Sequence, residues 1–255
     1  MEHLLRATAL AEARHFWFRG FRRFVTPLLD TAAGGRTGLR LLDCGCGTGN
    51  NLDLLSRYGR AFGFDLTAIG LKIGHDAGRR RLVRATVGAV PFPNAAFDIV
   101  TSFDVLYSLE SADEQAAIAE MLRVLRPGGA AVINVAAMES LRGDHSVLSR
   151  EVRRYSRASL RHALAGGGFI VESLTYTNAV LFPPMALARA WQRARGLSVE
   201  EHAAQEITVP PAPLNAVLNA ALAAESLWLR VGTNPFGSSL LCLARKPGPH
   251  GIRTT

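Results

Sequence analysis

The sequence predicts an α/β fold of the doubly wound type, in which a mostly parallel sheet carries helices on both faces. Short apolar runs alternate with amphipathic helical patterns along most of the 255 residues, as this fold requires. One run, LLDCGCGTGNNL at 41–52, reads as a buried strand that breaks into a glycine-rich turn and opens a helix. Such a turn suits a nucleotide-like ligand, because glycine lets the free amides at a helix start approach it closely.

The individual elements follow from the apolar runs and from the turn residues between them. Strands are expected near 39–44, 60–65, 81–87, 97–103, 129–136, 169–176 and 238–245. Helices are expected near 49–57, 67–77, 112–125 and 156–165. The third helix starts with Asp113 and Glu114, which suit a helix N-terminus, and Pro127, Gly128 and Gly129 are expected to close it. A ligand is expected at the carboxyl ends of the first, second and fourth strands.

The spacing of the glycines distinguishes two classes of cofactor. The dinucleotide fingerprint, G-x-G-x-x-G, would continue with a third glycine where this chain has Asn50. The pattern here is instead D-x-G-x-G-x-G from Asp43 to Gly49, and an acid, Asp65, ends the next strand. This combination resembles the class I S-adenosylmethionine-dependent methyltransferases.

The resemblance covers roughly residues 39–136. The segment AVPFPNAAFDIVTSFDVL at 89–106 resembles the family's fourth-strand region, and RVLRPGGAAVINV at 123–135 resembles its next helix end, turn and fifth strand. It implies a Rossmann-like sheet of seven strands, six parallel and one antiparallel. It also implies S-adenosylmethionine as cofactor and S-adenosylhomocysteine as product.

The resemblance also implies a set of cofactor-binding residues. In the family, the first acid lies near the methionine amino group, the glycines leave room for the methionyl part and the sugar, and the second acid binds the ribose. Carried onto this chain, the site consists of Asp43, Gly45, Cys46, Gly47, Gly49, Asn50, Asp65, Leu66, Thr86, Val87 and Phe103.

Two positions depart from the family pattern. Thr86 stands where many relatives have an aspartate that hydrogen-bonds the adenine amino group. Tyr107 and Ser108 stand where many relatives have a Glu-His pair, whose histidine sometimes acts as base. No general base can therefore be carried over from the family.

Composition agrees with a cytoplasmic enzyme of one compact α/β domain, which the resemblance identifies as a methyltransferase domain. Hydrophobic residues make up 48% of the chain, and no apolar run is long enough to span a bilayer. The first 23 residues are too rich in charge for a secretory signal, and three cysteines suggest a reducing compartment. We expect four parts within the domain: an N-terminal helical lid at 1–36, a cofactor-binding core at 37–137, a cap and helix at 138–168, and an inserted helical lobe at 178–236.

The net charge of +8 raises the question of a nucleic-acid or metal ligand. A nucleic-acid substrate is disfavoured, because the charge is spread along the chain and no nucleic-acid module is recognisable. The position after the fourth strand also lacks the Asn/Asp-Pro-Pro-aromatic tetrapeptide of many base-methylating enzymes. No metal is expected, because Cys44 and Cys46 have no nearby histidine or second cysteine pair to complete a site.

The N-terminal segment AEARHFWFRGFRRF, at 11–24, interleaves aromatic and basic residues. As a lid over the cofactor, it would bring His15, Trp17 and Arg19 to the site. As an amphipathic helix, it would cover the sheet with its aromatic residues and leave its arginines in solvent. The sequence leaves both alternatives open.

The segment 138–155 collects polar residues after the fifth strand. Arginine offers a bidentate donor to a phosphate or carboxylate, so Arg153, Arg154 and Tyr155 are candidates for binding a substrate, together with Trp17 and Arg19. The alternative is a solvated loop with a structural tyrosine. The candidates for a catalytic role are His15, Tyr107 and His145.

Two apolar-rich helices are expected in the inserted lobe, at 178–195 and 214–230. They could wall a hydrophobic pocket, form a dimer contact, rest on a membrane surface or pack against the sheet.

The sequence thus favours a methyltransferase that acts on an O, N or C nucleophile of a small or lipid-like acceptor. An anionic group on this acceptor is compatible with the sequence. It is expected to be a monomer or homodimer, with peripheral membrane contact left open. The alternatives are a noncatalytic S-adenosylmethionine-binding subunit of a partner and a nicotinamide-dependent oxidoreductase.

Overall fold

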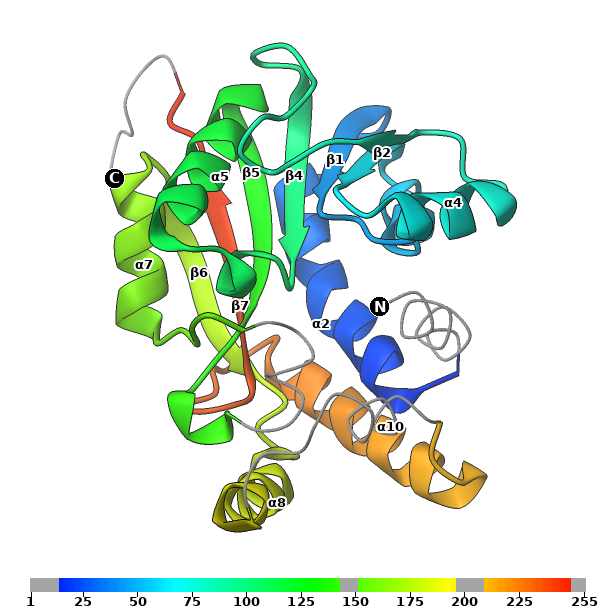
Figure 1. The fold of residues 1–255 in the computed structure, drawn as a ribbon, viewed down its shortest axis with the longest axis vertical. Coiled ribbons are helices and arrows are strands. Elements are labelled where there is room, and N and C mark those ends of the chain that lie inside the picture. The colour runs from blue at the N-terminus through cyan, green and yellow to red at the C-terminus, as the bar shows by residue number, and fades with distance from the viewer. Residues whose placement is uncertain (1–13, 143–150, 196–208, 249–255) are drawn as a thin grey trace.

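The computed structural model describes residues 14–142, 151–195 and 209–248, and its centre is a sheet of seven strands (Figure 1). The order across the sheet is β3-β2-β1-β4-β5-β7-β6. Only β7 runs antiparallel to its neighbours, which confirms the predicted six parallel strands and one antiparallel strand. The strands are β1 Leu39–Cys44, β2 Gly59–Asp65, β3 Leu82–Arg84, β4 Phe97–Phe103, β5 Leu125–Ala136, β6 Ile170–Thr177 and β7 Ser239–Arg245.

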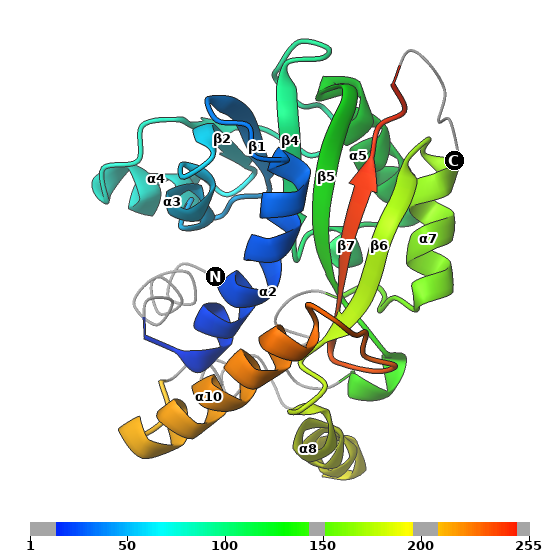
Figure 2. The same ribbon diagram turned by 180° about the vertical axis from the view of Figure 1, so that it is seen from behind.

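Helices cover both faces of the sheet (Figures 1 and 2). One hydrophobic cluster joins one face to α2, α3 and α4, and a second joins the opposite face to α5 and α7. The helices are α2 Phe16–Ala33, α3 Asn51–Leu55, α4 Ala68–Asp76, α5 Ser111–Val124, α7 Arg157–Gly166, α8 Phe182–Arg195 and α10 Ala212–Trp228, with short 3-10 turns at η1 Leu106–Ser108 and η2 Glu139–Leu141. No helix in the described ranges is long and apolar enough to cross a membrane.

The expected turn after α5 is replaced by the start of a strand. The helix ends at Val124, and β5 begins at Leu125, so that Pro127, Gly128 and Gly129 lie inside the strand. The amide of Gly128 donates to the carbonyl of Lys246 at 3.0 Å, while Gly128 adopts a left-handed φ of 75°. The glycine thus allows the strand to distort without losing its pairing partner.

The helix α2 packs against the sheet with its middle and C-terminal turns. Phe24, Val25 and Leu29 are buried on that side, and Figure 2 shows the helix crossing the sheet. Near its start, Phe21 lies edge-on to Phe103, the last residue of β4, with ring centroids 5.0 Å apart. The helix therefore covers the sheet and also reaches the carboxyl end of β4, so it combines features of both alternatives for this segment.

The inserted lobe contributes α8 and α10, which correspond to the two helices expected there. Polar and apolar contacts join α10 to α2. Asn215 Oδ1 accepts from the Phe16 amide at 2.9 Å, and Asn219 Oδ1 accepts from Arg23 at 2.7 Å. Leu222 is fully buried where Gly20 leaves space for it. The lobe is thereby anchored to the helix that reaches the site.

Candidate active site

The glycine turn after β1 has a backbone that only glycine adopts easily. Gly45, Gly47 and Gly49 have φ values of 75°, 56° and 77°, all left-handed. A Cβ on Gly45 would lie 2.4 Å from Val105 Cγ2, and one on Gly49 would lie 2.9 Å from Leu82 Cδ2. A Cβ on Gly47 would meet no atom within 4 Å. The turn is thus packed on both sides and open at its middle, where a ligand can approach the backbone.

The two predicted acids lie on either side of this turn. Asp65 Oδ2 accepts from the Gly47 amide at 2.8 Å, and its Oδ1 accepts from the Thr67 amide at 2.8 Å. Asp43 is buried, and its Oδ1 accepts from the Thr101 hydroxyl at 2.6 Å. Asp65 therefore holds the turn in place, whereas Asp43 lies beneath it.

Asp43 has an unsatisfied oxygen. Burial raises the pKa of its carboxyl to about 7, and the Thr101 hydroxyl and nearby Asn51 offset part of the rise. Within the described residues, Asp43 Oδ2 is buried without a partner of hydrogen-bonding geometry. A buried orphan oxygen is costly unless a ligand donor reaches it. The methionine amino group of S-adenosylmethionine is such a donor, so this residue fits the cofactor implied by the sequence.

The other residues predicted to bind the cofactor differ in their exposure and in their existing hydrogen bonds. Leu66 is exposed beside Asp65, and Thr86 and Val87 lie in the loop after β3. The Thr86 hydroxyl already accepts from the Gly88 amide at 3.2 Å. Phe103 is buried and in contact with α2. These positions lie at the carboxyl ends of β2, β3 and β4, and the ligand was expected at the carboxyl ends of β1, β2 and β4.

Two side chains predicted to bind cofactor have other partners. Asn50 Oδ1 accepts a hydrogen bond from Arg79. The sulfur of Cys46 packs on Gly63 of β2, where an added Cβ would lie 2.7 Å from it. What Cys46 offers a ligand is its backbone. Cys44 and Cys46 pack into different hydrophobic clusters, and burial raises the pKa of both thiols.

The two candidate catalytic residues in the described ranges, His15 and Tyr107, each make a structural contact. His15 caps α2, because its Nδ1 accepts from the Trp17 amide at 3.2 Å, and burial lowers its pKa. Tyr107 is buried in η1, and its carbonyl accepts from the amides of Val152 and Arg153. His145 lies outside the described residues. A catalytic role for any of the three stays a prediction.

The two arginines of the cap that were predicted to bind a substrate, Arg153 and Arg154, make internal contacts instead of lining an open anion site. Arg153 pairs with Glu114, which also accepts from the buried hydroxyl of Tyr155. Arg154 pairs with Glu151 through two bonds of 2.8 and 2.9 Å. Each guanidinium thus has a carboxylate of its own. These contacts favour a structural role, in which Arg153 and Tyr155 fasten the segment after β5 to α5, and Arg154 holds that segment together internally.

The two substrate candidates on α2 remain partly accessible. Trp17 is half-buried beside Phe16, with ring centroids 6.5 Å apart, and Arg19 is exposed. Their turn of the helix precedes Phe21, which contacts β4. The structure thus places them on the part of α2 nearest the carboxyl end of β4, and leaves their contact with a substrate as a prediction.

A polar residue missed by the sequence prediction is Asp104, the first residue after β4. It has a left-handed φ of 60° and is exposed. Asn134 of β5 donates to its Oδ1 at 2.8 Å. The next residue, Val105, packs on Gly45 of the turn. The only sequence signal was its place at the end of the predicted fourth strand, since neither its φ nor its partner on β5 is visible in the sequence.

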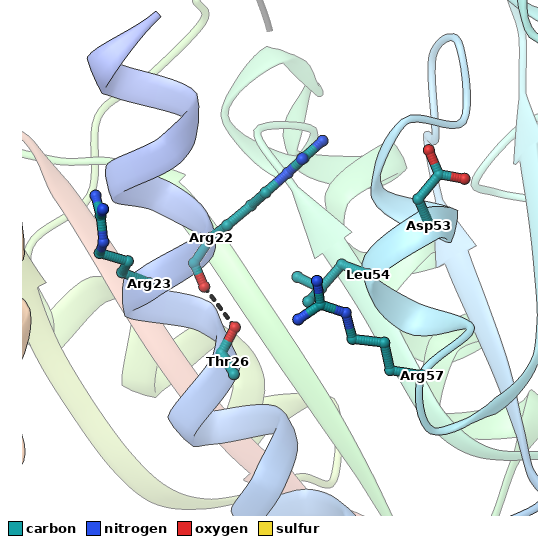
Figure 3. A pocket seen from close by; sticks show the side chains of 6 residues that line it. All are labelled: Arg22, Arg23, Thr26, Asp53, Leu54 and Arg57. Carbon is teal, nitrogen blue, oxygen red and sulfur yellow. Dashed lines mark hydrogen bonds between the residues drawn. The ribbon is translucent and has the colours of Figure 1, made fainter. Parts of the chain in front are cut away.

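A separate basic cavity lies between α2 and α3 (Figure 3). Its volume is about 240 Å³, and its lining includes none of the glycines of the turn. Its one acid, Asp53, is paired with Arg79 at 2.8 Å. The cavity is lined by Arg22, Arg23, Thr26, Asp53, Leu54 and Arg57.

Comparison with protein families agrees with the chemistry of this turn. Residues 42–133 match a family model described as a methyltransferase domain. A ubiquinone/menaquinone biosynthesis C-methyltransferase of Shewanella halifaxensis is 33% identical over 152 residues, which are 54% of this chain and 57% of that protein. Its counterpart from Stutzerimonas stutzeri is 37% identical over 126 residues, 44% and 45% of the two chains. The chain spans about half the length of the curated relatives it matches.

Comparison with solved structures shows the fold. The chain described as a methyltransferase in the complex with the Haloferax volcanii Trm112 methyltransferase activator has a TM-score of 0.60 at 19% identity, covering 98% of this chain and 96% of that one. Phosphoethanolamine N-methyltransferase 2 of Haemonchus contortus, with phosphomonomethylethanolamine and S-adenosylhomocysteine, has a TM-score of 0.53 at 18% identity, covering 87% and 52%. The [4+2]-cyclase SpnF has a TM-score of 0.53 at 21% identity, covering 89% and 94%. The reaction must therefore be argued from the site and not from the fold.

Proposed function

We propose that this chain, which belongs to the class I S-adenosylmethionine-dependent methyltransferases, transfers a methyl group to an oxygen, nitrogen or carbon atom of a small or lipid-like acceptor. The observation that carries the proposal is the site around the glycine turn. It combines an open backbone at Gly47, an acid bonded to that backbone from β2, and a buried acid with one unsatisfied oxygen. The family match over 42–133 covers all three features.

Each feature has a part of the cofactor that it would hold. Asp43 would take the methionine amino group on its free oxygen, and Asp65 would receive the ribose hydroxyls beside the Gly47 amide. The exposed side chain of Leu66 and the loop at Thr86 and Val87 would lie along the adenine. When bound, the cofactor supplies a methyl group on a sulfonium, whose neutral thioether is a good leaving group.

The protein's own contribution is alignment and the exclusion of water. Displacement at a methyl carbon needs the nucleophile in line with the breaking bond, and holding the two together lowers the entropic part of the barrier. The contact of Phe21 with Phe103 places an apolar wall at the end of β4. The α2 helix that supplies it is held by α10 through Asn215 and Asn219. The lobe thus supports the helix that would keep water from this part of the site.

The acceptor class is argued from the site and from the relatives. The Shewanella halifaxensis relative is named for ubiquinone and menaquinone biosynthesis, which supports a lipid-like acceptor here as well. An anionic group on the acceptor has less support, because Arg153 and Arg154 are paired with internal carboxylates. The division of the chain into lid, core, cap and lobe, a cytoplasmic location and a monomeric or homodimeric state belong to the same proposal.

The first test is calorimetric titration of the purified protein with S-adenosylmethionine, S-adenosylhomocysteine and NAD. We expect both sulfur compounds to bind, NAD not to bind, and Asp65→Ala to abolish binding. Binding of NAD alone would favour the nicotinamide-dependent oxidoreductase. Release of S-adenosylhomocysteine from S-adenosylmethionine should then be assayed with a panel of probe acceptors, for which we choose a quinol, a catechol, a prenyl diphosphate and phosphoethanolamine.

A second candidate function is a noncatalytic or partner-dependent subunit. It is favoured by the structural neighbour that is held by a methyltransferase activator, and by the absence of the family's Glu-His pair at Tyr107 and Ser108. Binding of S-adenosylmethionine without turnover across the panel, together with a stable partner in pull-downs, would favour this function over the first.

A further inference from the structure

The backbone of Asp104 adopts a conformation that aspartate rarely takes. Its φ is 60°, in the left-handed region that favours glycine, and its neighbours Phe103 and Val105 are large apolar residues. Such a conformation costs free energy and persists only where the surroundings impose it. Here Val105 packs on Gly45 and Phe103 on Phe21, so the chain must turn sharply between two apolar anchors. The turn presents the Asp104 side chain at the carboxyl end of β4.

Asn134 fixes the direction of this side chain. Its Nδ2 donates to Asp104 Oδ1 at 2.8 Å, and its carbonyl accepts from the Asp104 amide at 3.0 Å. Phe103 and Asn134 are also register partners between β4 and β5. A neutral amide holds one oxygen without adding a charge, and the residue stays exposed. The second oxygen is therefore available to a ligand.

The charged groups around Asp104 come from one neighbouring segment. Glu151 and Arg154 are paired with each other, and they act on Asp104 in opposite directions. Desolvation by the surrounding protein raises the pKa of Asp104 to about 7, and the Asn134 hydrogen bond lowers it in part. Because the residue is open to solvent, water offsets part of the rise. Its nearest partner across the strands, Asn134, carries no charge.

We propose that Asp104 is the proton acceptor at the reacting centre and that Asn134 is the residue that positions it. The proposal rests on the methyltransferase function proposed above, and it implies an acceptor that must lose a proton: a hydroxyl, an amine or an acidic carbon. In the step, the acceptor's electron pair forms the new bond to the methyl carbon, and the carbon–sulfur pair goes to sulfur. The acceptor's proton goes to the Asp104 carboxylate and is later released to water, so the charges balance.

A merely structural role for the same residue has different consequences. As a link between β4 and β5, Asp104 would need its amide and one side-chain oxygen, and Asn at position 104 would supply both. A proton acceptor needs the charge, which Asp104→Asn removes while keeping the shape. A charge next to the reacting centre must also interact with the positive sulfonium of S-adenosylmethionine, whereas S-adenosylhomocysteine is neutral. By linkage, the ratio of the two affinities then depends on the ionisation of Asp104.

The experiment measures the affinities of S-adenosylmethionine and S-adenosylhomocysteine by calorimetry at pH 5 and pH 8, a range that also covers a pKa of Asp104 below 7. In the wild type, we expect the preference for S-adenosylmethionine to rise by roughly 5-fold or more between these values. In Asp104→Asn, most of this change with pH should be lost, with S-adenosylhomocysteine bound as in the wild type. Asp113→Asn, which removes an exposed carboxylate on α5, should behave like the wild type. Asp43 also titrates in this range, but it is present in all three proteins, so its effect cancels when the pH dependence of the variant is compared with that of the wild type.

A wild-type ratio that does not change with pH would overturn the proposal, as would an unchanged pH dependence in Asp104→Asn. Failure of every variant and of the wild type to bind either compound would instead overturn the proposed function. With any panel acceptor that the wild type methylates, Asp104→Asn should lower kcat by roughly 100-fold or more, which is far more than the roughly 5-fold loss of affinity for S-adenosylmethionine expected from the missing charge. A loss below about 3-fold would contradict the role as proton acceptor.

Discussion

Asp65 and Gly47 are joined by a hydrogen bond of 2.8 Å, in which the carboxylate at the end of β2 accepts from an amide of the glycine turn after β1. The bond connects the two parts of the cofactor motif, which lie 18 positions apart in the sequence. It means that the acid expected to bind a ribose also shapes the turn. Changes at Asp65 therefore affect both binding and the cofactor-free protein.

Asp65→Ala should lower the free energy of unfolding by about 2 kcal/mol, because two backbone amides lose a charged acceptor. Urea denaturation of the cofactor-free protein measures this loss. Lys72→Ala, which removes an exposed ion pair on α4, is the control and should change stability by less than about 1 kcal/mol. Full stability in Asp65→Ala would mean that water replaces the carboxylate at the turn.

The cofactor-free protein should lose stability through Asp43 as pH rises. The pKa of this carboxyl in the folded state is about 7, above the usual value of 3.8, so the folded state binds the proton more tightly than the unfolded chain. The stabilisation is complete below the unfolded pKa and is lost between about pH 4 and pH 7, by at most about 1.4 kcal/mol per pH unit. Urea denaturation across this range should show a smaller decline for Asp43→Asn. An equal decline in both proteins would contradict the assignment to Asp43.

Glu225 should be among the most sensitive positions of the lobe. Its buried carboxylate accepts from the amides of Ala179 and Val180, at 2.9 and 3.1 Å, and from the side chain of Asn234 at 2.7 Å. Glu225→Leu leaves these donors without an acceptor and should cost about 3 kcal/mol of unfolding free energy. Glu172→Leu, at a partly exposed ion pair with Arg245, should cost less than about 1 kcal/mol. Equal losses of unfolding free energy in the two variants would show that burial does not make the contacts of Glu225 more important for stability.

Replacing Tyr155 distinguishes a structural role from a substrate-binding role for this residue of the cap. Its hydroxyl donates to the buried Glu114, so Tyr155→Phe should lower the unfolding free energy by about 1 to 3 kcal/mol. If the role is structural, the variant should keep its affinity for S-adenosylhomocysteine and its KM for any panel acceptor. A large rise in KM with unchanged stability would instead restore the substrate-binding role predicted from the sequence.

Leu222 and Gly20 test whether the lobe supports α2. Leu222→Ala empties a fully buried position and should cost about 2 to 4 kcal/mol. Gly20→Ala places a Cβ 2.4 Å from Leu222 Cδ1 and should also destabilise the protein. The two changes together should cost less than the sum of their separate costs, because the smaller residue at 222 makes room for the new Cβ. Additive costs in urea denaturation would contradict direct packing of the two helices.

The sequence alone determined the approximate positions of the strands and the glycine turn at the cofactor site. These features depend on contiguous residues: an apolar run, a glycine spacing, and an acid at the end of the next strand. The physical reason is that both features are local. A glycine with a left-handed φ and a buried strand can each be recognised from neighbouring residues in the sequence, without knowledge of any distant residue. The boundary that failed, at Pro127 to Gly129, is one where the strand extends across a local turn signal, because Leu125 pairs with Phe97 of β4 and Gly128 bonds to Lys246 just beyond β7.

The tertiary structure alone decided what the polar side chains do. Arg153 and Glu114 are 39 positions apart, and Asp104 and Asn134 are 30 positions apart. The sequence showed arginines that could bind an anion, but a charge is available to a ligand only if no carboxylate from elsewhere in the fold neutralises it. In the same way, nothing in the sequence near Asp104 showed that an amide on β5 would hold its carboxylate at the carboxyl end of β4. Pairing of charges depends on distances through space, and these are fixed only when the sheet and its helices have packed.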